Sequence, residues 1–67
     1  MAMSRKHYRE VASIIREQWE ESERLPANER IEVRTSVALI TQGIATMFQI
    51  DNSNFDRSKF LEACGIK

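Results

Sequence analysis

The stretch SVALITQGIATMFQI, residues 36–50, would leave little polar surface as a helix, and this constrains the fold more than any other feature. A helix that is apolar nearly all round is a buried helix. Along one line of it, apolar side chains repeat in alternating steps of four and three, which predicts the seam of a helical hairpin or coiled coil. The members of this seam are Val33, Val37, Ile40, Ile44 and Met47.

Another set of apolar residues, Ile31, Ala38 and Ala45, falls on the opposite side of the same helix. A three-helix monomer of 67 residues cannot surround its central helix completely, so we expect this spare face to contact another subunit. Gly43 in mid-helix costs about 1 kcal/mol relative to alanine, and a close helix crossing explains it better than a functional kink does. The sequence therefore predicts a homo-oligomer whose interface includes Ile31, Ala38 and Ala45.

Two long antiparallel helices are predicted, the first over about residues 5–24 and the second over about residues 27–50. Ser4 is a favourable N-cap for the first helix. Because the residue before a proline avoids the helical conformation, Leu25 should end this helix and Pro26 should open the connection. The apolar stripe of the first helix consists of Tyr8, Val11, Ala12, Ile15 and Trp19.

The closing stretch NFDRSKFLEACGIK predicts a short helix over residues 57–64 that carries its own end signals. Asp56 suits the N-cap, and Phe55 before it can pack onto Phe60 in a hydrophobic staple. Gly65 supplies the left-handed residue of a Schellman-type ending. The predicted fold class is thus all-α: two long antiparallel helices plus a short capped C-terminal helix. We expect one domain, residues 1–67, that self-associates as a helical bundle.

Composition argues against several classes of partner. Ten Lys and Arg balance ten Asp and Glu, which disfavours a duplex nucleic acid as the partner. One cysteine and one histidine supply neither an intramolecular disulfide nor the ligands of a structural zinc, so no metal or other cofactor is expected. No apolar run approaches the roughly 20 residues that span a bilayer. We therefore expect no membrane partner and a cytoplasmic location.

No residue pattern in the chain indicates catalysis. Cys64 falls in the last turn of a helix among apolar neighbours, where the helix dipole does not stabilise a thiolate. His7 lies at the edge of an apolar stripe, where partial burial at an interface is the better expectation. The acidic residues of the first helix are expected to form a solvated face rather than a catalytic pair: Glu10, Glu17, Glu20, Glu21 and Glu23. The sequence indicates a protein that is not an enzyme.

The two ends of the chain carry motifs that point to a family. The opening MSRKHYREVASIIR and the closing DNSNFDRSKFLEACGI together resemble a family of small tailed-bacteriophage proteins. That family shows an RKHY or RKDY start and a DNPxFDRxxFxxACG end, and this chain departs from it at Ser53, where proline is usual. The resemblance implies a phage-encoded protein acting in an infected bacterium. It names no mechanism, although small phage accessory proteins often counter host defences.

Positive charge at two helix starts goes against the local electrostatic preference, because a helix N-terminus already carries partial positive charge. A bound anion or phosphate would turn this arrangement into an attractive one, with His7 or Tyr8 available to stack on a base. The alternative is that these cations are simply solvated. The candidate ligand- or partner-binding residues are Arg5, Lys6, His7, Tyr8, Arg9, Arg57 and Lys59.

Two functions remain open at this point. In the first, a non-enzymatic phage accessory protein, with counter-defence as a candidate role, sequesters a host protein or a phosphate-bearing nucleotide. In the second, the short third helix enters a DNA groove as a regulator of helix-turn-helix type. The second is weaker, because that helix would offer only Arg57, Ser58 and Lys59 to the groove.

Overall fold

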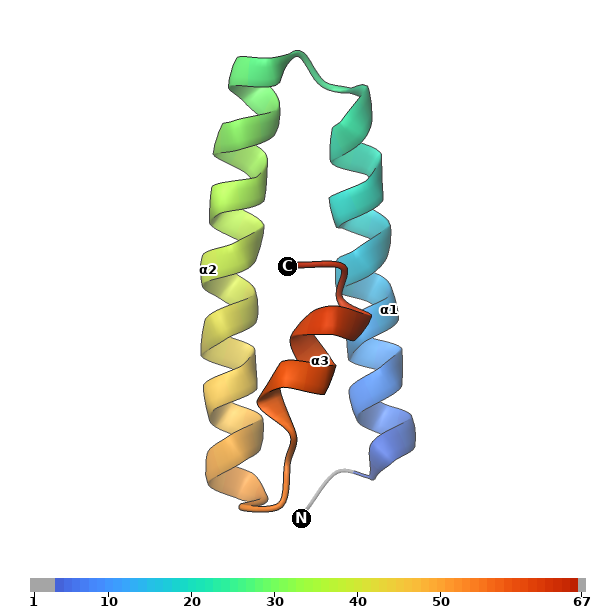
Figure 1. Ribbon diagram of the computed structural model, residues 1–67, viewed down its shortest axis with the longest axis vertical. Coiled ribbons are helices and arrows are strands. Elements are labelled where there is room, and N and C mark those ends of the chain that lie inside the picture. Colours follow the sequence, from blue (N-terminus) through green and yellow to red (C-terminus); the bar gives the residue numbers. More distant parts are fainter. Residues whose placement is uncertain (1–3, 67) are drawn as a thin grey trace.

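The structure is a computed structural model that describes residues 4–66 of the chain. It consists of α1 (Arg5–Glu21), a 3₁₀ turn η1 (Ser22–Arg24), α2 (Ala27–Asp51) and α3 (Arg57–Ala63), with no strand among the described residues (Figure 1). The prediction of an all-helical fold is confirmed. Met3, the first residue of the opening motif, lies outside the described residues.

The two long helices lie side by side and run in opposite directions (Figure 1). Their connection forms where the proline requires it: Leu25 is extended, with φ −84° and ψ 152°, and Pro26 takes the N-cap position of α2. The short α3 packs against both α1 and α2, at the end of the hairpin away from this connection. The molecule is therefore elongated, with extents of 40 × 18 × 17 Å.

Both ends of α3 match the signals in its sequence. The Asp56 side chain accepts a hydrogen bond from the backbone N–H of Lys59 at 3.1 Å, so it caps the helix. At the other end Gly65 has φ 80°, its N–H donates to the Glu62 carbonyl, and the N–H of Ile66 donates to the Leu61 carbonyl. These two bonds are those of a Schellman motif, so both predicted caps are confirmed.

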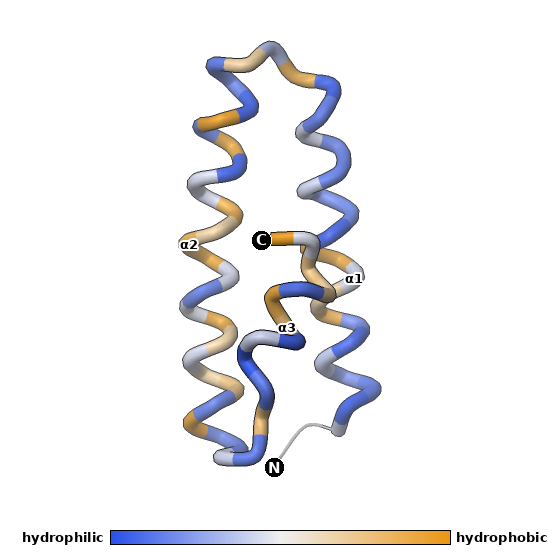
Figure 2. Tube along the Cα trace, viewed as in Figure 1, coloured by the Kyte–Doolittle hydropathy of each residue, from blue (hydrophilic) through white to orange (hydrophobic). Residues whose placement is uncertain are grey.

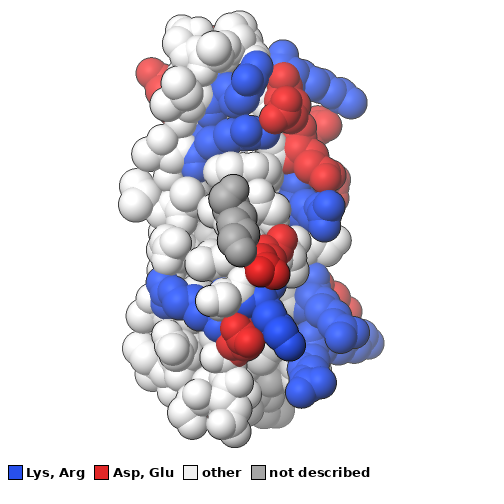
Figure 3. Space-filling model, in the orientation of Figure 1, with Lys and Arg blue, Asp and Glu red and all other residues white. Residues whose placement is uncertain are grey.

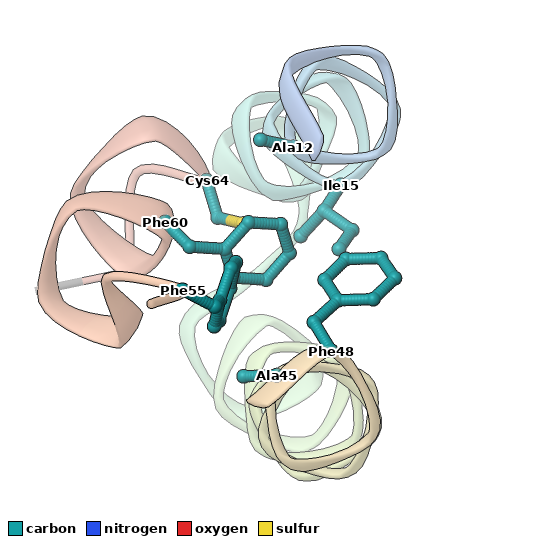
Figure 4. Packing of buried hydrophobic residues seen from close by; sticks show 7 residues of the cluster. All are labelled: Ala12, Ile15, Ala45, Phe48, Phe55, Phe60 and Cys64. Carbon is teal, nitrogen blue, oxygen red and sulfur yellow. The ribbon is translucent and has the colours of Figure 1, made fainter. Parts of the chain in front are cut away.

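The core lies where the three helices meet, and aromatic rings fill it. Phe48 of α2 contacts Tyr8 of α1 at 4.8 Å between ring centres, and Phe60 of α3 at 5.4 Å. Phe55 packs on Phe60 at 5.5 Å, which confirms the predicted hydrophobic staple. Figure 4 shows side chains from all three helices converging here. The buried apolar residues are Ala12, Ile15, Ala45, Phe48, Phe55, Phe60 and Cys64.

Near the connection there is no third helix, and polar contacts hold α1 to α2. The Arg34 guanidinium donates to the Ser22 hydroxyl at 2.7 Å and to the Trp19 carbonyl at 3.3 Å, and it pairs with Glu23. It also lies 4.8 Å from the centre of the Trp19 ring, in cation–π contact. One arginine of α2 therefore links α1, η1 and α2.

The predicted seam of α2 matches the inner face of the hairpin only in part, because the helix is turned so that Val33, Ile40 and Met47 point outward. Ile40 and Met47 are 62% and 54% exposed, and Val33 is exposed as well. The face that packs inside the molecule instead carries Thr41 and Phe48, with the half-buried Val37 and Ile44 at its edge. Figure 2 shows hydrophobic positions along the whole of α2, so its pattern alone did not select the inner face.

The same rotation corrects the predicted subunit interface. Ala45 is completely buried in the core of a single chain, so its assignment to a contact between subunits is wrong. Its small side chain lies where three helices converge, which is where a small residue permits a close approach. Ala38 is half-buried and Ile31 is exposed. Gly43 is exposed, and a Cβ added to it would meet nothing within 4 Å, so no helix of this chain crosses there.

Candidate anion-binding groove

A groove of about 550 Å³ runs between the start of α1 and α3. It exists because α3 folds back beside the first turns of α1, which brings together side chains distant in the sequence. Figure 3 shows Lys and Arg side chains over both ends of the molecule, with Asp and Glu side chains lying among them mainly near the connection. The groove is lined by Arg5, Tyr8, Arg9, Ala12, Asn52, Asn54, Phe55, Asp56, Lys59, Phe60 and Ala63.

Three cations border the groove without a partner. Arg5 and Arg9 come from α1 and Lys59 from α3, and all three residues are exposed. Within residues 4–66, none of the three side chains forms an ion pair or a hydrogen bond to the protein. Asp56 is the single carboxylate of the lining, and its Oδ1 accepts from a backbone amide. The groove therefore has a net positive lining.

The floor of the groove is apolar and held in place by packing. Phe55 and Phe60 are buried, and the Tyr8 ring is tilted 46° against Phe48 and 67° against Phe55. Because these contacts fix it, the Tyr8 ring belongs to the wall of the groove and is not a freely rotating stacking surface. The floor can contact the apolar part of a ligand while the cations reach its charged part.

A short polar turn forms the remaining edge. The Asn52 side chain donates to the Tyr8 hydroxyl at 3.5 Å, and its carbonyl oxygen accepts from the Asn54 backbone amide at 3.0 Å. These asparagines were not among the predicted site residues, since the sequence marked DNSN only as a turn. Their side-chain amides add donors and acceptors beside the cations.

Three predicted site residues do not line the groove. Lys6 is exposed beside it, and His7 caps α1, because its Nδ1 accepts the backbone N–H of Ser4 at 3.2 Å. His7 is exposed in the single chain. Arg57 reaches across to α2, where its guanidinium donates to Gln42 and to the Thr46 hydroxyl at 3.0 Å. The side chain of Arg57 thus fastens α3 to α2 and is not available to a ligand in the groove.

A second hollow, of about 450 Å³, lies against Trp19 near the polar end of the hairpin. Of its two cations, Arg34 bonds to Ser22 and Glu23, while Arg30 donates to the Leu25 carbonyl at 3.2 Å and keeps a buried Nε without a partner among residues 4–66. The charge of Arg34 is therefore used for holding the hairpin together. The groove beside α3 is the better candidate site.

The lining of the groove combines cations, one carboxylate, one phenol and apolar side chains. No cysteine or histidine is among its lining residues, and within residues 4–66 no group of three or more metal-ligating side chains comes together. Burial raises the pKa of the Cys64 thiol to about 11, which keeps it protonated and unreactive at neutral pH. What the lining offers an incoming ligand is positive charge over an apolar floor.

Comparisons of the chain with known protein families, with curated proteins and with solved structures each find no match. Among the described residues, no helix combines the length and the hydropathy that crossing a bilayer requires.

Proposed function

We propose that this chain is a non-enzymatic accessory protein of a phage that binds a phosphate-bearing nucleotide in the groove beside α3. The observation that carries the proposal is the convergence of Arg5, Arg9 and Lys59 around one apolar floor, with no side-chain partner for any of them among residues 4–66. A volume of about 550 Å³ lies within the range of small-molecule sites. The phosphate would meet the cations, and the base would lie against the aromatic wall.

The biological setting of the proposal comes from the resemblance of the two end motifs to small tailed-phage proteins. Holding a nucleotide requires no chemistry, so tight binding alone would remove a signalling nucleotide from an infected cell. Counter-defence in the cytoplasm of the host is the role that fits such sequestration. The same cations could anchor an acidic surface of a host protein, and the experiment below separates these two partners.

The geometry does not favour the alternative of a helix-turn-helix regulator. A recognition helix must present several side chains to the bases. In α3, seven residues long, Phe60 is buried and Arg57 is bound to α2. Lys59 is exposed, but it lines the groove rather than standing on an open helix face.

The proposal is tested by thermal unfolding in the presence of mono-, di- and cyclic nucleotides and of inorganic phosphate. A ligand at 100 times its dissociation constant adds about 2.7 kcal/mol of stability, which gives an easily measured rise in the midpoint. Arg5→Ala should weaken binding about tenfold or more, since a charge-assisted hydrogen bond contributes roughly 1.5–3 kcal/mol. Arg9→Ala and Lys59→Ala should do the same.

Lys6→Ala is the matched control, because Lys6 is an exposed cation of the same helical turn that does not line the groove. If no nucleotide or phosphate shifts the midpoint, the nucleotide is the wrong partner. If Lys6→Ala weakens binding as much as Arg5→Ala, general charge rather than the groove is responsible. Capture of an acidic host protein that depends on Arg5 and Arg9 but not on Lys6 would favour the protein partner instead.

Self-association is also part of the proposal, although the interface expected from sequence needed correction. The outer side of α2 has large exposed apolar side chains, which fits a chain too small to build a sizeable core alone. The surface and the geometry of that association are a separate question.

A further inference from the structure

The outer face of α2 is apolar although no element in the described part of the chain covers it. Between Thr35 and Ile50 the helix contains no charged residue. Ile50 is 83% exposed, Ile40 62% and Met47 54%, and Leu39 beside them is 68% exposed. Isolated exposed apolar residues are ordinary, but a continuous stripe of them along one helix marks an interaction surface.

The residues of this stripe follow a regular repeat. One set of positions, seven residues apart, holds Val33, Ile40 and Met47. A second set, three positions after each of these, holds Ser36, Gly43 and Ile50. Steps of three and four are those of a coiled-coil seam, in which side chains of one helix fit between those of its partner. We call these six residues the outer seam. It faces away from Thr41, Ala45 and Phe48, which pack inside.

We propose that the outer seam binds the outer seam of a second copy of this chain, with the two α2 helices antiparallel. In such a pair, each copy places Val33, Ile40 and Met47 against Ser36, Gly43 and Ile50 of the other copy. Ile40 then lies opposite Gly43. By the same register Met47 lies opposite Ser36, and Ile50 lies opposite Val33. The larger side chains of each copy thus meet smaller ones of the other, and the match is reciprocal, as a two-fold interface requires.

A parallel pair would match poorly. It would place Gly43 opposite Gly43 and Ile40 opposite Ile40, which leaves a gap in one layer and crowds another. Packing of side chains to interior density is what stabilises such an interface, and a layer with a gap loses those contacts. The alternation of large and small residues therefore selects the antiparallel geometry, and it also explains a glycine in mid-helix that no part of its own chain approaches.

The surface area of the chain fits this partner. A compact monomer of 7.8 kDa is expected to expose about 4,400 Å², whereas this chain exposes 5022 Å². The excess of about 600 Å² is somewhat below the roughly 800 Å² that each partner buries in an interface of standard size, so it suits a dimer with a small interface. An 18-residue seam is about 27 Å long at 1.5 Å per residue, so it covers most of one side of the 40 Å molecule.

The inference does not depend on ligand binding. The groove is lined by residues of α1, of α3 and of the turn before α3, and none of them belongs to the outer seam. The two proposals can therefore fail separately.

The first test is the mass in solution, measured by sedimentation or light scattering over a series of protein concentrations. The wild-type chain should be a dimer at tens of micromolar. Ile40→Glu should make it a monomer by placing a charge at the centre of the seam. Ile14→Glu is the matched control, because Ile14 is 64% exposed on α1 and should leave the dimer intact. A wild-type monomer at all concentrations would overturn the proposal, as would equal loss in both variants.

A variant that does not harm the monomer separates dissociation from misfolding. Gly43→Leu meets no atom of its own chain within 4 Å of the new Cβ and improves helix propensity, so the monomer should keep its helix content. It would fill the space that receives Ile40 of the partner, and we expect at least a tenfold weaker dimer. A dimer of undiminished affinity would overturn the proposed register.

The orientation of the pair is tested with introduced cysteines. Position 33 of one copy should face position 50 of the other, while equal positions 33 or 50 lie about 25 Å apart, too far for a disulfide. Mixing Val33→Cys with Ile50→Cys protein should give a disulfide-linked pair, and neither variant should link to itself. The native thiol of Cys64 is buried and should not compete. Self-linking of each variant without linking in the mixture would show a parallel pair and overturn the proposal.

Discussion

The hairpin is closed at one end by four aromatic rings and at the other by one arginine. At the aromatic end, Tyr8, Phe48, Phe55 and Phe60 pack between three helices. At the polar end, Arg34 joins Trp19, Ser22 and Glu23 between two helices. Both ends hold α1 against α2, but only the first buries much apolar area.

This difference follows from the number of helices available. Three helices enclose a space that water cannot reach, and apolar area buried there stabilises by about 25 cal/mol per Å². Two helices leave both sides of their contact open, so a side chain that is apolar along its stem and polar at its tip suits the position better. Net hydrogen bonds contribute only about 0.5–1.5 kcal/mol each. We therefore expect the aromatic end to dominate stability.

The largest predicted effect is that of Phe48→Ala at the aromatic end. It removes a side chain that touches Tyr8, Phe55 and Phe60 and leaves a cavity, so it should cost about 3–5 kcal/mol. That is as much as the core of a chain this small supplies, so the variant should be largely unfolded at 25 °C. Urea unfolding followed by circular dichroism would measure it, and a loss below 1 kcal/mol would show that the rings are not the main support.

At the polar end, Arg34→Ala should cost about 1–3 kcal/mol, clearly less than Phe48→Ala. It removes the hydrogen bonds to Ser22 and Trp19, the ion pair with Glu23 and the contact with the Trp19 ring, and it uncovers the buried Ser22. Glu23→Gln is the control, since an ion pair with this exposed carboxylate contributes about 0–1 kcal/mol. If Arg34→Ala destabilises as much as Phe48→Ala in the same urea experiment, the comparison of the two ends is wrong.

The caps of α3 come next, because they place this helix at the aromatic end. Asp56→Ala should cost about 0.5–2 kcal/mol by removing the bond to the Lys59 amide. Gly65→Val should cost at least as much, since a β-branched residue resists a φ of 80°. Asp51→Ala is the control: Asp51 is an exposed acid at the end of α2, where a negative charge is not stabilising. The thermal midpoint should fall in Asp56→Ala and at least as far in Gly65→Val, and Asp51→Ala should not lower it.

The helix boundaries and caps were predictable because their causes are local. Pro26 restricts the residue before it, Asp56 lies three residues from the amide it accepts, and Gly65 alone among its neighbours tolerates positive φ. Each of these signals depends only on residues close in the sequence and not on the packing of another helix. The start of α1 at Arg5 and the end of α3 before Gly65 were found for this reason.

The inner face of α2 was not predictable from periodicity, because two faces of the helix satisfy the same pattern. Phe48 has to reach the aromatic rings of α1 and α3, and this turns Ile40 and Met47 outward. Thr41 also obscured the inner face, because a polar residue is expected at the surface. Its hydroxyl donates to the Val37 carbonyl at 2.7 Å, so the side chain is buried at little cost in free energy. Contacts with the aromatic rings of α1 and α3, which are distant in the sequence, therefore decide which face of α2 is buried.

The groove was predictable only in part. The unfavourable charge at helix starts pointed to Arg5, Arg9 and Lys59, which the fold brings together. The same signal included Arg57, but a long cation can also be used by its own protein, and α2 offered it three polar partners. Whether a cation lines the groove or bonds to α2 depends on how α3 packs against α1. The charge pattern of a single helix does not predict that packing.

The smallest predicted effect tests how completely the aromatic end excludes water. Burial raises the pKa of Cys64 from 9.0 to about 11, so the folded state favours the protonated thiol. This contribution to stability is fully present below about pH 9, the value for the unfolded chain, and is lost as the pH rises through about 11. Urea unfolding of wild type and Cys64→Ala across this range isolates it, since other groups titrate in both proteins. The difference in unfolding free energy between them should be constant below pH 9 and should shrink above it. A difference that stays constant to pH 11 would mean that the thiol ionises as easily in the folded chain as in the unfolded one, and that water reaches the core beneath α3.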